Sequence, residues 1–519
     1  MRKQFFTAGL VILATCAVMG QQPRTVWTDF CTDSTVTNIN PTGIIVDATG
    51  NSYLAANGNS VPSGNADVLL FKYTPSGQRL WMKSFDSPDH GGDAVRTLLP
   101  SGDGNFFLPG WHQVGANSCI QIIKCTPAGD TLWMRRYTET CDLGIWIYDW
   151  VSDSAGNIYC GGKIYGEQEA EHWVIAKFNG DGSFGWLRTK TAAPYEKLAA
   201  NALALDSEGN LGVTGIAADL STASVFTCKY SSAGDELWCR NFAAFPGAAA
   251  DDGRALAIDD VGNLIVVGQT TVTNAPLDVD LLVIKYSPDG DTLWTRRFGP
   301  TAGLSDFGTH VVCDGNDNIV VAGYTNLGEY GISDLAVLKF SPNGQLLWSD
   351  VYDGVTHESD EPGALQVAAD GSIVVLAMND RSDTFDTGDM LLRKYEHWGR
   401  VVWNQKYYGL GNTFELAELL APDPTGNWLV SGWSSDGGSN YSAYLNKYSD
   451  FLCGDADNSR TLSVSDVIFL IHYIFIGGPI PNPKLSGDAD CNGILTISDA
   501  VYLISYIFAG GPAPCAACP

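Results

Sequence analysis

The sequence predicts an all-β fold, an eight-bladed β-propeller with a seven-bladed ring as the alternative, followed by a small helical module. Three recurring marks predict the propeller: a Gly-Asn turn, a Lys that ends an apolar run, and a Trp after a Gly-x-x-Leu turn. The stretch 255–298 holds one complete copy. Its four short apolar runs, separated by Gly, Asn, Asp and Pro, are typical of four antiparallel strands.

Each mark occurs eight times, and this repetition decides the number of blades. The turn position is occupied by Asn51, Asn105, Asn157, Asn210, Asn263, Asn318, Ser372 and Asn427. The Lys mark recurs as Lys72, Lys124, Lys177, Lys229, Lys285, Lys339, Lys394 and Lys447. The Trp mark recurs as Trp27, Trp81, Trp133, Trp186, Trp238, Trp294, Trp348 and Trp403. Copies lie roughly 52 to 56 residues apart, a spacing that propeller blades have.

The two ends of the repeat array are complementary. No turn mark or Lys mark precedes Trp27, and no Trp strand follows Lys447. We therefore expect the strand at 25–30 to complete the sheet built by residues 415–448, because a ring sealed by both termini has no open edge at the seam. Eight Trp residues at one repeat position are expected to pack between sheets rather than stack on sugars. Each recurring Lys is expected to reach a turn carboxylate.

The composition and the N-terminus limit the function. A formal net charge of -28 opposes binding to nucleic acid or anionic membranes. Residues 1–20 combine a basic start with a short apolar run, the pattern of a secretory signal peptide. The sequence thus predicts a secreted protein with the propeller at 21–449, a C-terminal module at 454–519 and no further membrane span. An uncleaved anchor at the cell surface and a lipid anchor at Cys16 are the alternatives.

Twelve cysteines remain after the predicted signal peptide. Export makes disulfides available. Four cysteines lie at apolar positions of predicted strands and are expected to be buried thiols: Cys125, Cys160, Cys228 and Cys239. Four others are expected to cross-link the C-terminal module, with a connectivity that sequence leaves open: Cys453, Cys491, Cys515 and Cys518.

The repeat resembles a known family. The pattern Asp-x-x-Gly-Asn-x-x-x-x-Gly, then Lys-Tyr, then Gly-x-x-Leu-Trp, is similar to SBBP-type bacterial propeller repeats over about 24–448. Its Gly-x-x-Leu-Trp element also resembles the tryptophan-docking motif of quinoprotein propellers. The resemblance implies the propeller fold, and it implies little about activity because propellers carry unrelated functions.

Two features predict where the propeller would bind a ligand. One class of connection between strands is short and uniform, whereas the other is long and varied, so we expect a glycan or protein ligand on the variable face. Acidic residues also recur at the start of the innermost strand and predict an acidic rim at one mouth of the channel, a candidate cation or ligand site: Asp93, Asp251, Asp306, Asp360 and Glu415. The alternative is that each of these carboxylates bonds the backbone of a neighbouring blade.

The C-terminal module contains a second internal duplication, with copies at 454 and 487 that are 33 residues apart. Each copy places oxygen-bearing residues at positions 1, 3, 5 and 12 of a calcium loop, with a backbone carbonyl at position 7 and Ser463 or Thr496 at position 9. The predicted ligands of two Ca²⁺ ions are Asp455, Asp457, Ser459, Thr461 and Asp466, and Asp488, Asp490, Asn492, Ile494 and Asp499. Loop two has Gly493 at the sharp turn where loop one has Arg460, so loop two is expected to bind Ca²⁺ more tightly.

This duplicated loop-helix pattern resembles a type I dockerin over nearly all of 454–512. The resemblance implies a cohesin-domain partner. The residues that match the family's recognition positions are Val464, Ser465, Ile471, His472 and Ile476, and Ile497, Ser498, Ile504, Ser505 and Ala509. The Val-Ser and Ile-Ser pairs depart from the commonest Ser-Thr pairs. A calcium-stabilised terminal module without a cohesin partner is the alternative.

The sequence contains none of the catalytic motifs that we sought, including His-Glu-x-x-His, Gly-x-Ser-x-Gly and a phosphate-binding Gly-rich loop. We therefore expect a non-catalytic binding or scaffold protein. The alternative is a carbohydrate-active lyase or hydrolase, or a glycan-binding component of a polysaccharide-degrading complex. A quinoprotein dehydrogenase is disfavoured because the chain has no adjacent Cys pair.

Overall fold

The computed structural model describes most of the chain from residue 23 to residue 514. The described ranges are 23–61, 65–87, 91–114, 117–141, 144–165, 170–191, 196–219, 221–244, 248, 250–272, 279–300, 304–326, 332–354, 357–368, 370–381, 389–407, 415–435, 441–449, 453–457, 459, 461–481 and 484–514. The predicted signal peptide at 1–20 lies outside them, as do Arg460, Cys515 and Cys518.

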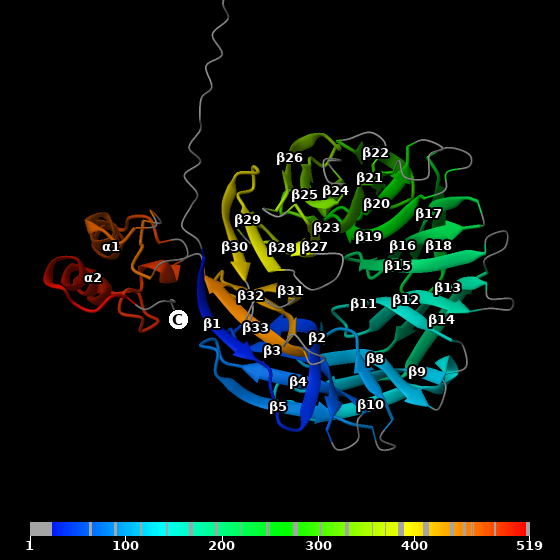
Figure 1. The fold of residues 1–519 in the computed structure, drawn as a ribbon, viewed down its shortest axis with the longest axis horizontal. Helices are drawn as coiled ribbons and strands as arrows, with labels where there is room; N and C mark the ends of the chain where they lie inside the picture. Colours follow the sequence, from blue (N-terminus) through cyan, green and yellow to red (C-terminus); the bar gives the residue numbers. More distant parts are fainter. Residues whose placement is uncertain are drawn as a thin grey trace, which may run out of the picture.

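Strands dominate the described chain, and they gather into antiparallel sheets arranged around a central axis (Figure 1). In the first half of the chain they are β2 (Val36–Val46), β3 (Ser52–Ser60), β4 (Ala66–Tyr73), β5 (Arg79–Phe85), β6 (Asp93–Val95), β7 (Leu99–Pro100), β8 (Phe106–Val114), β9 (Asn117–Cys125), β10 (Thr131–Tyr137), β11 (Trp146–Ser152), β12 (Ile158–Tyr165), β13 (Glu171–Phe178), β14 (Phe184–Lys190), β15 (Lys197–Leu205), β16 (Leu211–Ala218), β17 (Ala223–Tyr230) and β18 (Glu236–Phe242).

The second half continues the same succession of strands. They are β19 (Asp252–Ile258), β20 (Leu264–Thr271), β21 (Val279–Tyr286), β22 (Thr292–Phe298), β23 (Phe307–Cys313), β24 (Ile319–Asn326), β25 (Ser333–Phe340), β26 (Leu346–Tyr352), β27 (Ser359–Val367), β28 (Ile373–Arg381), β29 (Asp389–Tyr395), β30 (Val401–Tyr407), β31 (Glu415–Pro422), β32 (Trp428–Ser435) and β33 (Tyr441–Ser449). A short 3-10 turn, Thr138–Thr140, follows β10.

Each sheet is built from strands that are consecutive in the sequence. The four-stranded sheets are β2–β5, β19–β22, β23–β26 and β27–β30, while β6–β10 form a sheet whose innermost strand is divided into β6 and β7. The units β11–β14 and β15–β18 are each antiparallel, and the parallel bridge Glu171–Lys197 pairs one with the other as a single sheet. The second and third strands of a unit read as continuous apolar runs, because neighbouring sheets cover both of their faces. In β20, for example, every residue is buried.

The remaining sheet joins the two ends of the repeat array. Its strand order is β1-β33-β32-β31, and β1 (Arg24–Phe30) pairs antiparallel with β33. Trp27 lies opposite Lys447. The expected closure of the ring by strands from both ends of the array is therefore confirmed.

The turn mark and the Lys mark form one polar network. Asp259 accepts hydrogen bonds from the Asn263 backbone N–H (2.8 Å) and side-chain amide (2.7 Å), and its carboxylate pairs with the Lys285 ammonium at 2.8 Å. Burial alone would raise the pKa of Asp259, but Lys285 and the Asn263 bonds outweigh it and the pKa is lowered. Equivalent ion pairs of 2.7–2.9 Å are made by Lys229, Lys339 and Lys447, and Lys124 pairs at 2.8 Å with Asp103, the third residue of its turn. The predicted contact of these lysines with a turn carboxylate is thus confirmed.

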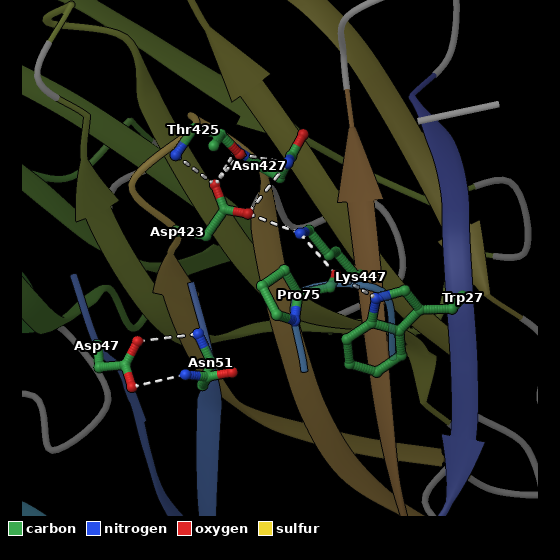
Figure 2. A network of polar contacts seen from close by, with 8 residues as sticks. All are labelled: Trp27, Asp47, Asn51, Pro75, Asp423, Thr425, Asn427 and Lys447. Carbon is green, nitrogen blue, oxygen red and sulfur yellow. Dashed lines mark hydrogen bonds and ion pairs between the residues drawn. The ribbon is translucent and has the colours of Figure 1, made fainter. Parts of the chain in front are cut away.

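The Trp mark links each sheet to the next. The Trp294 indole N–H and the Lys285 ammonium both donate to the carbonyl of Pro342, in the turn between β25 and β26 of the following sheet. The indole covers Gly344 in the same turn, where a Cβ would lie only 2.7 Å from the ring. Figure 2 shows the same arrangement at the seam, where Trp27 and Lys447 both donate to Pro75. The recurring Trp residues thus pack between sheets, as predicted.

Replacing Lys285 with Met should lower the free energy of unfolding by about 3 kcal/mol, because it leaves the nearly buried Asp259 carboxylate without its cation. Urea denaturation of the full chain measures the change. The matched control is Lys190→Met, which removes a partly exposed ion pair with Glu236 and should cost below about 1 kcal/mol. Equal effects of the two substitutions would contradict the role that we assign to the network.

The cysteines differ partly from expectation. Cys125 and Cys160 are buried thiols, as predicted. The prediction was wrong for Cys228 and Cys239, which form a disulfide between directly paired positions of β17 and β18 with their Cα atoms 4.1 Å apart. The register that brings the two thiols together depends on strand pairing, so apolar position alone could not reveal it. A second disulfide joins Cys119 to Cys141.

Two helices of equal length lie beside the ring of sheets (Figure 1). They are α1 (Val464–Ile476) and α2 (Ile497–Ala509), with a short 3-10 turn, Lys484–Gly487, between them. Ser463 caps α1 and Thr496 caps α2, and each helix ends at a glycine in the left-handed conformation. The small core between the helices consists of Ala456, Val467, Leu470, Ala489, Ala500 and Leu503. The predicted helical module is thus present.

Candidate functional site

The loop before α1 gathers three carboxylates. Asp455, Asp457 and Asp466 each place an oxygen so that all three lie within 4.8 Å of one another. The backbone N–H of Ser459 donates to Asp455 at 2.9 Å and to Asp457 at 3.0 Å, and this bends the loop around the first carboxylate. Thr461 adjoins Ser459 through a hydroxyl contact of 3.2 Å. The predicted loop-one ligands therefore lie together.

The loop before α2 repeats this arrangement. Asp488, Asp490 and Asp499 also bring carboxylate oxygens within 4.8 Å of one another. The backbone N–H of Gly493 donates to Asp488 at 2.8 Å, and that of Ile494 donates to the Asn492 side chain at 2.8 Å. Gly493 has φ +80°, a conformation that glycine adopts without strain. The turn expected at position 6 is thus present in loop two.

Both clusters fit Ca²⁺. This ion takes six to eight oxygens at about 2.3–2.6 Å, so two oxygens bound to one ion lie at most about 5 Å apart. The carboxylates of each loop meet that limit. Burial raises the pKa of Asp466 and of Asp499 to about 6, and the neighbouring carboxylates add to the shift. Three acidic groups held this close repel one another when ionised, and a divalent cation removes the repulsion.

Both helices expose large apolar side chains. The buried side chains of α1 include Val467 and Leu470, and those of α2 include Ala500 and Leu503, so the opposite faces remain open. Of the residues predicted to meet a partner, Val464, Ser465, Ile471, His472, Ile476, Ile497, Ile504 and Ala509 are exposed, and Ser498 and Ser505 are half-buried. Four further apolar residues that were not among the predicted contacts are also exposed on these helices, in pairs 33 residues apart: Ile468 and Val501, and Phe475 and Phe508.

The acidic residues of the innermost strands do not form an open rim. Asp93, Asp251, Asp306 and Asp360 are fully buried. Their oxygens accept hydrogen bonds from the connection that leads into the strand or from the second strand of the same sheet: Ser87 N–H to Asp93 (2.8 Å), Thr271 N–H to Asp251 (2.6 Å), Asn326 N–H to Asp306 (3.2 Å) and Gly354 N–H to Asp360 (2.7 Å). Glu415 is the first residue of β31, and its side chain lies outside the described part. The expectation of an exposed rim was therefore wrong for these four residues, which are buried and hydrogen-bonded to backbone N–H groups, in the case of Asp251 and Asp306 also within their own sheet.

One of these carboxylates belongs to a third acidic cluster. Asp360, Asp334 at the start of β25 and Asp353 after β26 bring oxygens within 4.8 Å of one another. Asp353 also contacts His357 Nδ1 at 2.6 Å. The cluster thus lies where the sheets β23–β26 and β27–β30 adjoin.

A pocket of about 370 Å³ opens between the sheets β6–β10 and β11–β14. Its lining includes Arg96, Trp111 and Ser118 from the first sheet and Trp146, Tyr148 and Trp150 from β11. Trp146 is 59 % exposed, Tyr148 41 % and Trp111 37 %. The Arg96 guanidinium lies 5.4 Å from the Trp111 ring centre. Trp146 begins β11 and Ser118 is near the start of β9, so the pocket opens toward the face of variable connections.

The segment that leads into β11 is fixed against the neighbouring sheet. Cys141 is bonded to Cys119 of β9, and both cysteines line the pocket. The Thr140 hydroxyl accepts a hydrogen bond from the Ile120 N–H at 3.0 Å and donates to the Tyr137 carbonyl at 2.6 Å. The pocket wall is thus held by a covalent bond and two hydrogen bonds.

The repeated motifs do not predict this pocket, although the sequence contains a signal for it. Trp146 is paired with one particular position of the second strand of its sheet, and each of the other repeats has one residue paired with that same position. These residues are Asn40, Ala94, Ala199, Asp252, Phe307, Glu361 and Leu416. In four other repeats an Asp occupies the position that corresponds to Cys119: Asp67, Asp280, Asp334 and Asp389. A comparison of repeat positions with one another therefore singles out this junction as the one where an exposed Trp and a disulfide replace the usual residues.

A larger cavity of about 820 Å³ lies on the opposite, uniform face. Its lining includes Asp314, Lys339 and Trp348, which are members of the repeated turn network. Equivalent residues recur around the ring, so this cavity is a consequence of the repeated packing of one sheet against the next. Its larger volume is therefore no reason to identify it as a specific binding site.

The ring of consecutive four-stranded antiparallel units defines the chain as a β-propeller. No family model matches the sequence, and no curated protein matches it. Among the described residues, neither helix has the length and apolar character needed to cross a bilayer.

Several solved structures are similar in fold. One is the β-propeller domain of the Trilobed protease from Pyrococcus furiosus, at 8 % identity over 80 % of this chain and 94 % of that chain, with a TM-score of 0.36. Another is the polysaccharide lyase Uly1, at 10 % identity over 78 % and 89 %, with a TM-score of 0.37. A third is a protein of unknown function from Dyadobacter fermentans, at 12 % identity over 82 % and 99 %, with a TM-score of 0.38. At these values the similarity carries no argument about activity.

Proposed function

We propose that this chain is a secreted, non-catalytic binding protein in which an eight-bladed propeller is displayed through a C-terminal type I dockerin. Two Ca²⁺ ions hold the dockerin loops, and a cohesin-domain protein is the partner. The observation that carries the proposal is the duplicated set of three carboxylates before two helices with exposed apolar faces. The predicted signal peptide supports export, with anchoring at the cell surface as the alternative.

The exposed helix faces support a protein partner. Ile476 is 71 % exposed, Phe508 69 % and Phe475 66 %, and a module this small gains no stability from leaving such side chains in water. Contiguous apolar surface of this kind marks an interaction site in a soluble protein. The sides of the helices that face each other are already occupied by the small core. The partner is therefore expected to contact the opposite faces.

The eight-bladed interpretation rests on eight strand groups. Seven of them follow β2 to β30 in sets built on one repeat each, and the eighth combines β31–β33 with β1. A glycan-binding role within a polysaccharide-degrading complex is the second candidate function. The exposed aromatic side chains of the pocket between β6–β10 and β11–β14 favour it.

Capture of the full chain by immobilised type I cohesins tests the docking role. We expect capture in Ca²⁺ and none in EDTA. The double variant Ile471→Asp, Ile504→Asp should bind at least about 30-fold more weakly, since the loss of even one central apolar contact costs about 2 kcal/mol. Ile480→Asp, which changes an equally apolar residue outside both helices that is 50 % exposed, should bind as the unchanged chain does.

Two outcomes would decide against this proposal. Equal capture in Ca²⁺ and in EDTA would contradict the role of the metal. Ca²⁺-dependent folding without capture by any cohesin of the panel would favour the alternative, a calcium-stabilised terminal module with no cohesin partner.

A further inference from the structure

The pocket between β6–β10 and β11–β14 is where the propeller departs from its own repeat. The recurring Trp marks are used to hold one sheet on the next, through bonds such as that from Trp294 to Pro342. Trp111 and Trp146 are not members of that set, and both line an open cavity. A ring of nearly identical units gains a specific site only where one junction differs, and this junction differs in its aromatic residues and in its disulfide.

We propose that this pocket binds a pyranose ring of a neutral polysaccharide. A sugar ring presents a flat face of C–H groups and a rim of hydroxyls, so it needs an apolar aromatic surface beside hydrogen-bonding groups. Trp111, Trp146 and Tyr148 supply exposed aromatic surface, and Arg96, Ser118 and the Tyr148 hydroxyl supply polar groups. The volume of about 370 Å³ lies at the lower end of the range for small-ligand sites, which suits one or two sugar rings.

Two further observations support a ligand there. Trp150 lines the pocket and is 5 % exposed, and its indole N–H has no acceptor among the described residues. A buried donor of this kind is costly unless something meets it. The pocket wall is also rigid before binding, because the Cys119–Cys141 disulfide and the Thr140 bonds fix the segment leading into β11. Rigid sites bind with a smaller loss of conformational entropy.

The electrostatics favour a neutral sugar over an acidic one. Arg96 is the one cationic side chain among the lining residues. Burial raises the pKa of the nearby Glu418 carboxyl of β31, and the positive charge of Arg96 only partly opposes that rise. The chain as a whole carries a formal charge of -28, which repels polyanions. Arg96 is therefore better placed to donate hydrogen bonds to hydroxyls than to hold a carboxylate.

Affinity gel electrophoresis of the full chain tests the proposal, with xylan, xyloglucan, mixed-linkage β-glucan and galactomannan as neutral probes and polygalacturonate as the acidic probe. We expect retardation by at least one neutral probe. The double variant Trp111→Ala, Trp146→Ala should reduce that affinity at least tenfold, while keeping the thermal unfolding transition. Trp398→Ala is the matched control, because Trp398 is 54 % exposed but lines the cavity on the uniform face, and its affinity should not change.

Three results would overturn the proposal: no retardation by any neutral probe, unchanged affinity of the double variant, or binding to polygalacturonate alone with its loss in Arg96→Gln. The inference rests on the proposed binding role of the propeller and not on the C-terminal module. Repeating the electrophoresis in EDTA separates the two, because retardation should persist there while cohesin capture is lost.

Loss of the Cys119–Cys141 bond in the double variant Cys119→Ala, Cys141→Ala should weaken retardation by loosening the pocket wall.

Discussion

Removing Ca²⁺ is expected to unfold the C-terminal module and to leave the propeller folded. Six carboxylates form the two clusters, and the core that opposes their repulsion contains only six buried apolar residues. Each bound ion stabilises the folded module by about 4 kcal/mol when free Ca²⁺ is a thousand times its dissociation constant. Without the ions that stabilisation disappears, while the turn network of the propeller contains Lys–Asp pairs that need no metal.

Calorimetry of the full chain measures this effect. We expect two transitions in Ca²⁺, of which EDTA removes the one that belongs to the C-terminal module. Asp488→Ala should abolish that transition at micromolar Ca²⁺, whereas Asp455→Ala should only weaken it, because Gly493 gives loop two its unstrained turn. Asp260→Ala, which removes an exposed carboxylate from a propeller turn, is the control and should change neither transition. Equal sensitivity of the Asp488 and Asp455 variants would contradict the ranking of the loops.

Deleting residues 21–32 should abolish cooperative folding of the propeller. The deletion removes β1, so the backbone groups of β33 that pair with it become an open edge. It also removes Trp27, whose ring covers Gly77 and whose N–H bonds the Pro75 carbonyl (Figure 2). The first and last sheets then lose both their shared strand and their Trp contact, and we expect aggregation of the variant.

Urea denaturation and light scattering of the purified variant measure this second effect. The control is Trp398→Ala, which alters a Trp that is 54 % exposed and lies in a turn. A soluble, monomeric deletion variant with the melting temperature of the full chain would contradict ring closure by β1. The full-length variant Trp27→Ala should have a stability between those of the deletion variant and the unchanged chain. Its free energy of unfolding should fall by about 3–5 kcal/mol, the cost of removing a packed Trp.

The features that occur in every repeat could be predicted from the sequence. Asp-x-x-Gly-Asn, Lys and Trp recur together, so their roles in one unit apply to the others. In the structure Asp259 of the turn pairs with Lys285, and Lys285 and Trp294 both donate to the Pro342 carbonyl. The unequal ends of the array predicted the closure through β1 and β33. That closure was predictable because it is the arrangement of the two ends that leaves no strand edge open at the seam.

The acidic rim shows where such counting fails. The innermost strand has an irregular register in several sheets, for example between Gly253 and Ala255 and between Gly308 and His310. A bulge changes the face on which the residues before it lie relative to those after it. Counting back from the turn to Asp251 or Asp306 crosses this bulge, so it gives the position along the strand but not the direction of the side chain.

The disulfide and the pocket needed the structure for a different reason. Cys228 and Cys239 occupy apolar positions whether or not they are bonded, and only the pairing of β17 with β18 brings them together. The pocket combines Arg96 and Trp111 of one sheet with Trp146 and Tyr148 of the next. These residues belong to two different repeats, so no single motif contains them.

The most direct test of the proposed function is the number of Ca²⁺ ions that the C-terminal loops bind, measured by native mass spectrometry of the full chain after removal of bound metal. The full chain should bind two more ions than the double variant Asp455→Asn, Asp488→Asn, in which each loop loses the charge of its first ligand. The same number of ions on both proteins would contradict the account, because the first carboxylate of neither loop would then be needed to hold Ca²⁺.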